Sequence, residues 1–357
     1  MSWWRSVLAG PGIAVAAVTA AMLLILFGLA LFGHAPGEVA ATWCHGAAGT
    51  GIRLALSLQE ACPLLLTGLA VAIAFRCGVL NIGGEGQFLI GAVVLVAFAT
   101  RWAIPGPGWL VLPLALLLAA AAGAGWALLA TGLERWRGVP VVLSTILLNF
   151  VAVFLVSGLV EGPFRDPATT APQSALIADA FHLPVLVDST RLHLGALLAL
   201  IIAVALWLVL TRTTLGFEIR AAGLNPLAAR IAGMPVTSRQ VLVMGASGAL
   251  AGLAGGLQVA GVTWFLSGSP TSYGYAGIAA ALLGRLHPLG VVLAAILLGM
   301  LDTGGRALEK HLAIPHDLGD VVKGLAVLTV LVAGVWVAQR QLRTRVTLPQ
   351  GGTDGDQ

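Results

Sequence analysis

Apolar stretches of membrane-spanning length follow one another along almost the whole chain. A helix needs about 20 apolar residues to cross the hydrocarbon core of a bilayer. Of the 357 residues, 58% are hydrophobic and 10% are charged, which is more apolar surface than a soluble core of this size needs. We therefore predict an all-α fold, a polytopic integral membrane helical bundle of about 8 to 10 transmembrane helices. The predicted spans, each near spanning length, are 13–33, 54–75, 86–99, 109–133, 139–160, 192–210, 241–262 and 321–337.

Two shorter apolar segments, 275–283 and 289–301, lie between the last two of these spans. The hinge between them, 284–288, contains a glycine and a proline. Because each segment is short for a full crossing, we expect a re-entrant hairpin or a broken pair of helices near 275–301. Such backbone is tolerated at membrane depth only where it is buried in protein or lines a cavity.

The first span, 13–33, is longer than the apolar core of a cleavable signal, which has about 7 to 15 residues, so we expect it to be retained. The expected organisation is an N-terminal transmembrane helix and first outer loop at 1–50, a membrane core at 51–340 and a disordered cytoplasmic tail at 341–357. The core includes a hydrophilic cytoplasmic loop at 211–240.

The charges of the loops predict the orientation. Basic residues gather at 134–137, in the loop 211–240 and in the tail from Arg340, and the positive-inside rule places these segments, with both termini, in the cytoplasm. The segment 161–188 carries four acidic residues against one arginine and is expected outside. The same rule explains the net charge of +4 without nucleic acid as a partner.

The loop 211–240 contains four arginines and one glutamate, and it includes a short predicted helix. Asn225 is a good N-cap, Pro226 suits the first helical position, and Gly233 can end the helix in a left-handed conformation. The apolar residues Leu227, Ile231 and Met234 are expected to share one face, with charges around it from Glu218, Arg220 and Arg230. Such a helix suits insertion into a groove of a protein partner, because its apolar face is too short to bind membrane lipid strongly.

Polar side chains lie at the predicted start of one span and inside another. Asn81, Glu85 and Gln87 stand among glycines, and Glu85 either caps the following helix or contacts substrate, two interpretations that are compatible. Ser144 and Asn149 lie inside the span 139–160, where Asn149 forms an interhelical hydrogen bond or, less favoured, lines a conduit. We take these five residues as the candidate substrate pathway.

Three glycines, Gly248, Gly252 and Gly256, recur every four residues in the span after the basic loop. Such spacing predicts close helix packing rather than chemistry.

Motifs of catalysis are absent from the sequence. It contains no phosphate-binding loop, no zinc-protease motif and no serine nucleophile turn, and the seven histidines and three cysteines show no ligand spacing. We therefore predict no catalytic residues, no metal site and no cofactor bound by this chain.

Several stretches together resemble one family: FRCGVLNIGGEGQFLIGA, VVLSTILLNFVAV, TTLGFEIRAAGLNPLAARIAGM, SGALAGLAGG and GYAGIAAALLGRLHPLG. They are similar to the permease subunits of bacterial ABC importers of the ribose and simple-sugar, nucleoside and branched-chain amino acid group. The motifs at 81–87 and 144–149 look most like the nucleoside branch, often called simple-sugar permeases. The similarity runs from about Pro63 to Val337, which is most of the chain.

The resemblance implies a subunit of a heteromeric importer in the bacterial inner membrane. Expected partners are a cytoplasmic ABC ATPase that binds ATP and Mg, a second permease subunit that forms a heterodimer with this one, and an extracytoplasmic substrate-binding protein. The transported solutes would be nucleosides or related ribose and simple-sugar compounds. The expected ATPase-coupling residues are Phe217, Glu218, Arg220, Gly223, Asn225, Pro226, Arg230 and Gly233.

An alternative prediction is an ATP-independent secondary transporter of a small polar solute. Such a protein usually holds an ion-coupling carboxylate at mid-membrane, and Glu85 is the one well-placed candidate that the sequence suggests.

Overall fold

The computed structural model describes residues 35–102, 106–268 and 272–314, with isolated positions between 19 and 33 and between 321 and 329. These residues form a helical bundle, which confirms the predicted fold class. The predicted spans 13–33 and 321–337 and the predicted disordered tail lie outside the described segments. The helices are α2 (Pro36–Ala48), α3 (Gly51–Arg76), α4 (Gly84–Thr100), α5 (Gly108–Arg137), α6 (Val141–Glu161), α7 (Leu194–Arg212), α8 (Thr214–Leu224), α9 (Pro226–Ile231), α10 (Val236–Gln258), α11 (Tyr273–Leu283) and α12 (Pro288–Leu312), with the short turns η1 (Asp179–Phe181) and η2 (Val259–Thr263).

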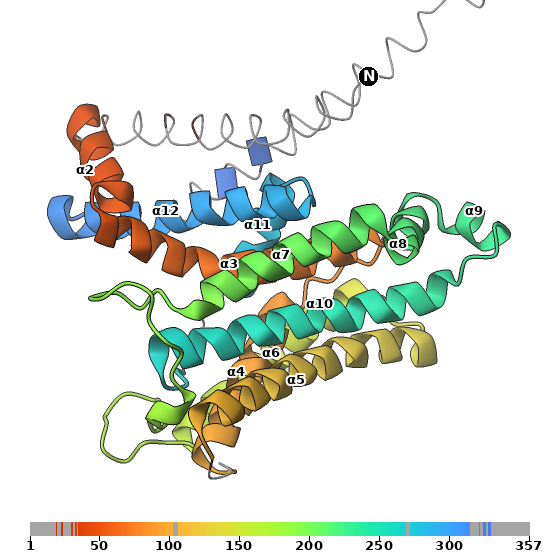
Figure 1. The fold of residues 1–357 in the computed structure, drawn as a ribbon, viewed down its shortest axis with the longest axis horizontal. Helices are drawn as coiled ribbons and strands as arrows, with labels where there is room; N and C mark the ends of the chain where they lie inside the picture. The colour runs from red at the N-terminus through yellow and green to blue at the C-terminus, as the bar shows by residue number, and fades with distance from the viewer. Residues whose placement is uncertain are drawn as a thin grey trace, which may run out of the picture.

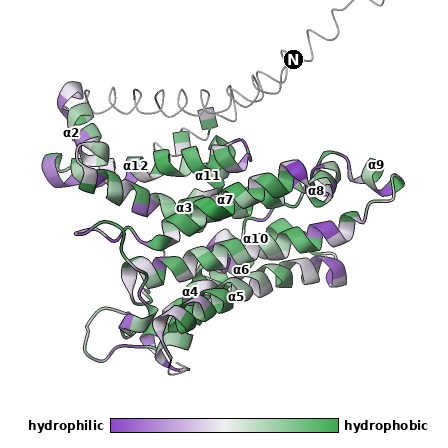
Figure 2. Ribbon diagram, in the orientation of Figure 1, coloured by the Kyte–Doolittle hydropathy of each residue, from purple (hydrophilic) through white to green (hydrophobic). Residues whose placement is uncertain are grey.

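Six of the described helices are long and apolar enough to cross a membrane, namely α3, α5, α6, α7, α10 with η2, and α12, whereas α4 and α11 are shorter apolar helices. The long helices run side by side between two polar ends (Figure 1). Green, apolar ribbon covers most of their length, and purple gathers at the helix ends (Figure 2). We call these ends the α2 end and the α9 end, after the helices that lie there.

The α2 end is closed by the long connection between α6 and α7. This connection bonds to the segment that follows α10, with Ile177 N donating to Trp264 O at 2.9 Å and Ser174 N donating to Leu266 O at 3.0 Å. The ring of His182 stacks on Trp264 with centroids 4.4 Å apart. The segment expected as an outer loop therefore covers one end of the bundle as an ordered layer.

Two parts of the chain have the same succession of elements. In the first part, α3 is followed by an extended segment, the short helix α4 and the long helix α5. In the second part, α10 is followed by the turn η2, a connection, the short helix α11 and the long helix α12. The packing crosses between them, because α3 packs on α11 and α12 while α10 packs on α4 and α5. The short helix of each part therefore packs against the long helix that begins the other part.

One expectation about an individual element is corrected, and one expected segment contains an additional helix. The segment 289–301 is not a short half-helix, because α12 continues to Leu312. Asp302 and Arg306 interrupt its apolar pattern without ending it, and Leu298, Leu301 and Ala307 keep a buried stripe that packs on α2 and α3. The segment expected as the first outer loop contains α2, which begins at Pro36 and packs on α12.

Close contact between α10 and α5 depends on glycines. A Cβ added at Gly252 would lie 2.5 Å from the carbonyl oxygen of Ala119, and one added at Gly256 would lie 2.9 Å from the Ala119 Cβ. At Gly248 an added Cβ would clash with the carbonyl oxygen of Gly123. No side chain fits between the two helices at these positions, so the small residues set their separation.

Candidate functional site

The short helices α4 and α11 begin inside the bundle, and their first turns meet. A Cβ added at Gly274 would clash with the backbone of Glu85, so the two helix starts are in direct backbone contact. Glu85 Oε1 accepts a hydrogen bond from Ser272 N at 3.0 Å, and Oε2 accepts one from Gly274 N at 2.8 Å. A helix start leaves backbone N–H groups without partners, and a carboxylate satisfies them while it interacts favourably with the helix dipole.

The position of Glu85 refines the interpretation made from the sequence. It does lie in the first turn of α4, as expected of a capping residue. Its carboxylate, however, also bonds to the start of α11, which is a different helix. Glu85 is therefore a clamp between the two short helices, and its side chain is almost completely buried.

Asn81, in the extended segment that precedes α4, forms a reciprocal pair with Gln87, in the first turn of α4. Asn81 Nδ2 donates to Gln87 Oε1 at 3.0 Å, and Gln87 Nε2 donates to Asn81 Oδ1 at 3.0 Å. Asn81 Nδ2 also donates to Ser247 Oγ on α10 at 2.9 Å, and Ser247 in turn donates to Ala70 O on α3 at 2.7 Å. The two amides thus tie α3, the extended segment, α4 and α10 together.

Asn149 connects α6 to the same place. Its Oδ1 accepts from Gly86 N at 2.8 Å, and its Nδ2 donates to Ile82 O at 3.0 Å and contacts the Tyr275 hydroxyl at 3.3 Å. The structural interpretation from the sequence, an interhelical hydrogen bond, is confirmed. Ser144 lies one turn away on α6 and is also buried, but its hydroxyl makes no hydrogen bond within the described residues.

The structure brings four of the five predicted pathway residues together around the facing starts of α4 and α11, which we call the break. The fifth, Ser144, lies on the buried face of α6, five residues before Asn149. We call this group the polar cluster: Asn81, Glu85, Gln87, Ser144 and Asn149. Each member is at most 3% exposed, and the polar atoms of four of them are bonded within the protein. Direct contact with a solute remains a prediction, because in this conformation these side chains hold the backbone around the break.

A second buried carboxylate was missed in the sequence. Glu60 lies on α3, accepts from the Tyr273 hydroxyl at 2.8 Å and forms an ion pair with Arg306 of α12 at 3.0 Å. The sequence suggested Glu85 as the one acidic group inside the bundle, whereas the structure buries Glu60 there as well. The acidic and basic residues are visible in the sequence, but their pairing depends on helices that are far apart along the chain.

The basic loop between α7 and α10 forms the α9 end. Asn225 ends α8 and caps α9, with its Oδ1 accepting from Ala228 N at 3.0 Å, and Pro226 occupies the first turn. Gly233 has a φ of +81°, which is the left-handed conformation predicted for it. The predicted start and end of the short helix are therefore confirmed.

The loop contains a second helix, α8, that was not predicted from the sequence. Glu218 and Arg220, expected around α9, lie on α8, where Glu218 pairs with Arg239 at the start of α10. Met234 does not belong to the exposed face either, because it is partly buried against the core at the base of the loop. We call α8 and α9 together the coupling segment.

Two glycines dock α8 onto the bundle. A Cβ at Gly223 would clash with the carbonyl oxygen of Arg76, and one at Gly216 would clash with the carbonyl oxygen of Val209. Gly223 also lies beside Gly78, which opens the extended segment leading to Asn81. The coupling segment therefore touches the chain that leads to the polar cluster.

In contrast, α9 presents apolar side chains to the outside. On α9, Leu227 and Ile231 are 68% and 80% exposed, and Leu224, at the end of α8 beside it, is 87% exposed. Exposed apolar groups beside polar ones on a short, capped helix are typical of a surface that binds another protein.

Helices long and apolar enough to cross a membrane, and short helices that begin inside the bundle, are features of membrane transport proteins. A family model described as "Branched-chain amino acid transport system / permease component" matches residues 53–331. The chain belongs to this family of permease subunits of ABC importers, as the resemblance implied.

Characterised relatives cover most of the chain. The guanosine ABC transporter permease protein NupP of Bacillus subtilis is 38% identical over 77% of this chain and 79% of its own length. The nucleoside ABC transporter permease protein NupB of Lactococcus lactis is 34% identical, over 77% and 78%. A glucose ABC transporter permease protein of Haloferax volcanii is 34% identical, over 83% and 80%. The chain is thus a multi-pass permease subunit, and these relatives do not favour the alternative of an ATP-independent transporter.

Proposed function

We propose that this chain translocates nucleosides, or related ribose and simple-sugar solutes, into the cytoplasm of a bacterium. The names of NupP and NupB support this solute class, and the glucose permease supports the wider sugar class. Neutral, hydroxyl-rich solutes also suit a membrane interior whose polar residues are mainly amides and hydroxyls. The protein lies in the inner membrane, with the α9 end and both termini in the cytoplasm.

The energy comes from a partner. A separate cytoplasmic ABC ATPase binds ATP and Mg, whereas this chain binds no cofactor and catalyses no reaction. A second permease subunit completes a heterodimer, and an extracytoplasmic binding protein delivers the solute at the α2 end. The core at 51–340 performs transport, with 1–50 and 341–357 as flanking regions.

The exposed face of α9 is the observation that carries this proposal. The α9 side chains bind in a groove of the ATPase. Closure of the ATPase dimer then moves the coupling segment as a rigid body. The contacts of Gly223 with Arg76 and Gly78 pass that movement to the extended segment before α4. The polar cluster then rearranges at the break, and the pathway opens to alternate sides.

The five residues of the polar cluster contact the solute in that rearranged state. Their hydrogen bonds to one another must be exchanged for bonds to the solute or to water, because a buried polar group without a partner costs about 1 to 3 kcal/mol. The half-helix starts at α4 and α11 suit such a site, since solute sites of transporters lie where helices are broken at mid-membrane.

Uptake into proteoliposomes tests the proposal. The full complex with its ATPase, second permease and binding protein is expected to accumulate a radiolabelled nucleoside only when ATP is present on the α9 side. Excess unlabelled guanosine should compete, whereas a branched-chain amino acid should not. Uptake by this chain alone under an ion gradient would overturn the proposal and establish a secondary transporter.

A further inference from the structure

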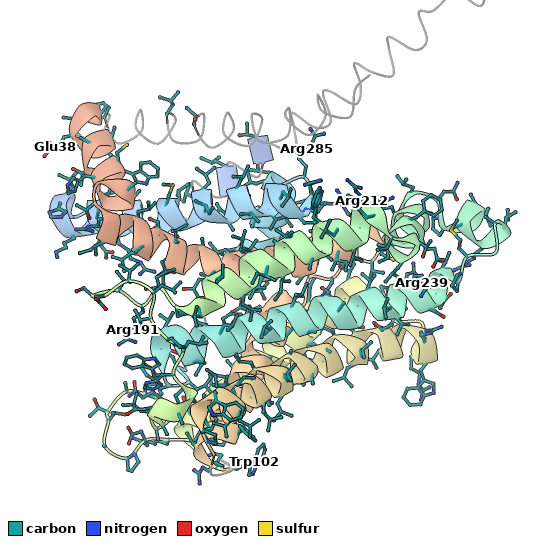
Figure 3. The ribbon with its side chains drawn as sticks, viewed as in Figure 1. Glu38, Trp102, Arg191, Arg212, Arg239 and Arg285 are labelled. Carbon is teal, nitrogen blue, oxygen red and sulfur yellow. The ribbon has the colours of Figure 1, made fainter. Side chains whose placement is uncertain are left out.

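A cavity lined by basic residues lies at the α9 end, beside the coupling segment. Its volume is about 480 Å3, and it lies between the ends of α3 and α7, the helix α8 and the turn from α11 to α12. Figure 3 shows Arg212 and Arg285 at this end of the molecule, one at the end of α7 and the other in the α11–α12 turn. The lining residues are Arg76, Trp207, Thr211, Arg212, Arg220 and His287.

The cavity holds positive charge that the described part of the chain does not neutralise. Three arginines and a histidine line it, and none of its lining residues is acidic. The nearby carboxylate of Glu218 is already engaged by Arg239. The Nη1 atom of Arg220 is buried and makes no hydrogen bond to any described residue. A buried, charged donor without a partner is unfavourable, so the site suits an anion with several acceptor oxygens.

The electrostatics of His287 agree with this. Burial, and then the positive charge of Arg76, lower the pKa of His287 below its usual range. Burial is the larger of these two causes, and the positive charge of Arg76 acts in the same direction. The turn that carries it is also unusual, because Arg285 and Leu286 both have positive φ angles of 52° and 57°. Two successive non-glycine residues in this conformation are strained and persist where the surroundings hold them.

The position of the cavity indicates where the anion comes from. α7 is the most exposed of the described candidate membrane spans, with 22% of its apolar window buried within this chain, so its outer face is available to lipid. Trp207, which lines the cavity, stands near the end of this helix, where tryptophan marks the boundary between acyl chains and head groups. Basic pockets between helices at such a boundary bind anionic lipid head groups.

We propose that the cavity binds the phosphate group of an anionic membrane lipid, and that the bound lipid steadies the coupling segment against α3 and the α11–α12 turn. The phosphate oxygens accept from Arg76 and Arg220, and Arg212 provides a further cation at the rim. The assignment to the cytoplasmic leaflet rests on the proposed function, whereas the binding chemistry does not. ATP-driven transport by this permease then requires anionic lipid at its cytoplasmic face.

Binding is tested with the full chain in detergent, by titration with short-chain phosphatidylglycerol and measurement of the melting temperature. Phosphatidylglycerol is expected to raise the melting temperature of the wild type more than phosphatidylcholine does. Arg76→Gln and Arg220→Gln each remove a charged donor, and each should weaken the lipid response about tenfold in concentration. Arg135→Gln, at the same end of the bundle but outside the cavity, removes the same charge and should respond like the wild type.

Further measurements distinguish the lipid from other molecules that could supply the anion. Inorganic phosphate and ATP, tested at millimolar concentration without lipid, should not reproduce the effect, and an effect of these alone would overturn the lipid assignment. An equal lipid response in the wild type and all variants would also overturn it. The proposal would also be overturned if lipid had no effect on the wild type and Arg76→Gln no longer bound the ATPase. That result would show that the cavity binds a carboxylate of the ATPase.

Two controls keep the result interpretable. If Arg76→Gln does not fold, Arg212→Gln tests the same cavity with an exposed side chain. Failure of the proposed function would appear as loss of ATP-dependent uptake in every lipid, whereas failure of the lipid proposal would leave uptake equal in vesicles of phosphatidylcholine with and without phosphatidylglycerol.

Discussion

The polar cluster and the coupling segment use polar residues in opposite ways. In the polar cluster, almost every polar side-chain atom is bonded within the protein, and the members are at most 3% exposed. In the coupling segment, α8 is docked tightly by Gly216 and Gly223, while α9 keeps its apolar face free for another molecule.

The difference shows where each region obtains its stability. Removing a partner inside the cluster leaves buried donors without acceptors, so we expect large losses of stability there. Changing the exposed face of α9 removes few contacts within the chain, so we expect transport to fail while the fold persists. The predictions below follow this order, from the largest expected effect on stability to the smallest.

Glu85→Ala is expected to have the largest effect. It removes both acceptors of Ser272 N and Gly274 N, and each buried donor left unpaired costs about 1 to 3 kcal/mol. Glu85→Gln keeps one acceptor oxygen and should lose less. The measurement is the melting temperature in detergent, with Glu134→Gln, an exposed acid at the end of α5, as the control. Equal melting temperatures of Glu85→Ala and the wild type would show that Glu85 does not hold α4 and α11 together.

Gly223→Ala should destabilise the protein by about 1 to 3 kcal/mol, because the added methyl group clashes with the carbonyl oxygen of Arg76. The matched control is Gly132→Ala on α5, where nothing lies within 4 Å of an added Cβ. There the same substitution should leave stability unchanged or raise it by up to about 1 kcal/mol, since alanine favours helix. The melting temperatures should therefore move in opposite directions. If both rise, α8 is not held against α3 as the structure indicates.

Asn225→Ala should cost about 1 kcal/mol, and locally, because it removes the cap that accepts from Ala228 N. Hydrogen exchange of the α9 amides should become faster while exchange in α10 does not change. Asn225→Asp and Asn225→Ser keep a capping oxygen and should restore slow exchange. Unchanged exchange in Asn225→Ala would show that α9 is stabilised by something other than its cap.

Features that depend on neighbouring residues could be predicted from the sequence. The long spans followed from apolar runs of sufficient length, and the bounds of α9 followed from Asn225, Pro226 and Gly233. The five residues of the polar cluster were selected as polar groups in apolar surroundings, and the structure buries all five. Local propensity and the cost of burying polar groups are sufficient for these conclusions.

Features that depend on distant residues could not be predicted. Glu85 bonds to Ser272 across 187 positions, and Glu60 bonds to Tyr273 across 213. A single sequence does not show which polar groups will share a buried site. The full length of α12 was missed because Asp302 and Arg306 lower its hydropathy, although Arg306 is neutralised by Glu60 once α3 is in place. The docking of α8 likewise depends on a backbone contact with α3.

Leu227→Glu combined with Ile231→Glu should have the smallest effect on stability, within about 0.5 kcal/mol, because both side chains are 68% or more exposed. ATP-dependent uptake by the reconstituted complex should nevertheless fall to background, since two carboxylates cannot enter an apolar groove of the ATPase without losing their hydration. Leu176→Glu, which changes an exposed leucine in the connection at the α2 end, should keep both stability and uptake. Normal uptake by the double variant would show that α9 is not the docking surface. A fall in its melting temperature equal to that of Glu85→Ala would show instead that α9 is part of the stable core, and the contrast between the two regions would no longer hold.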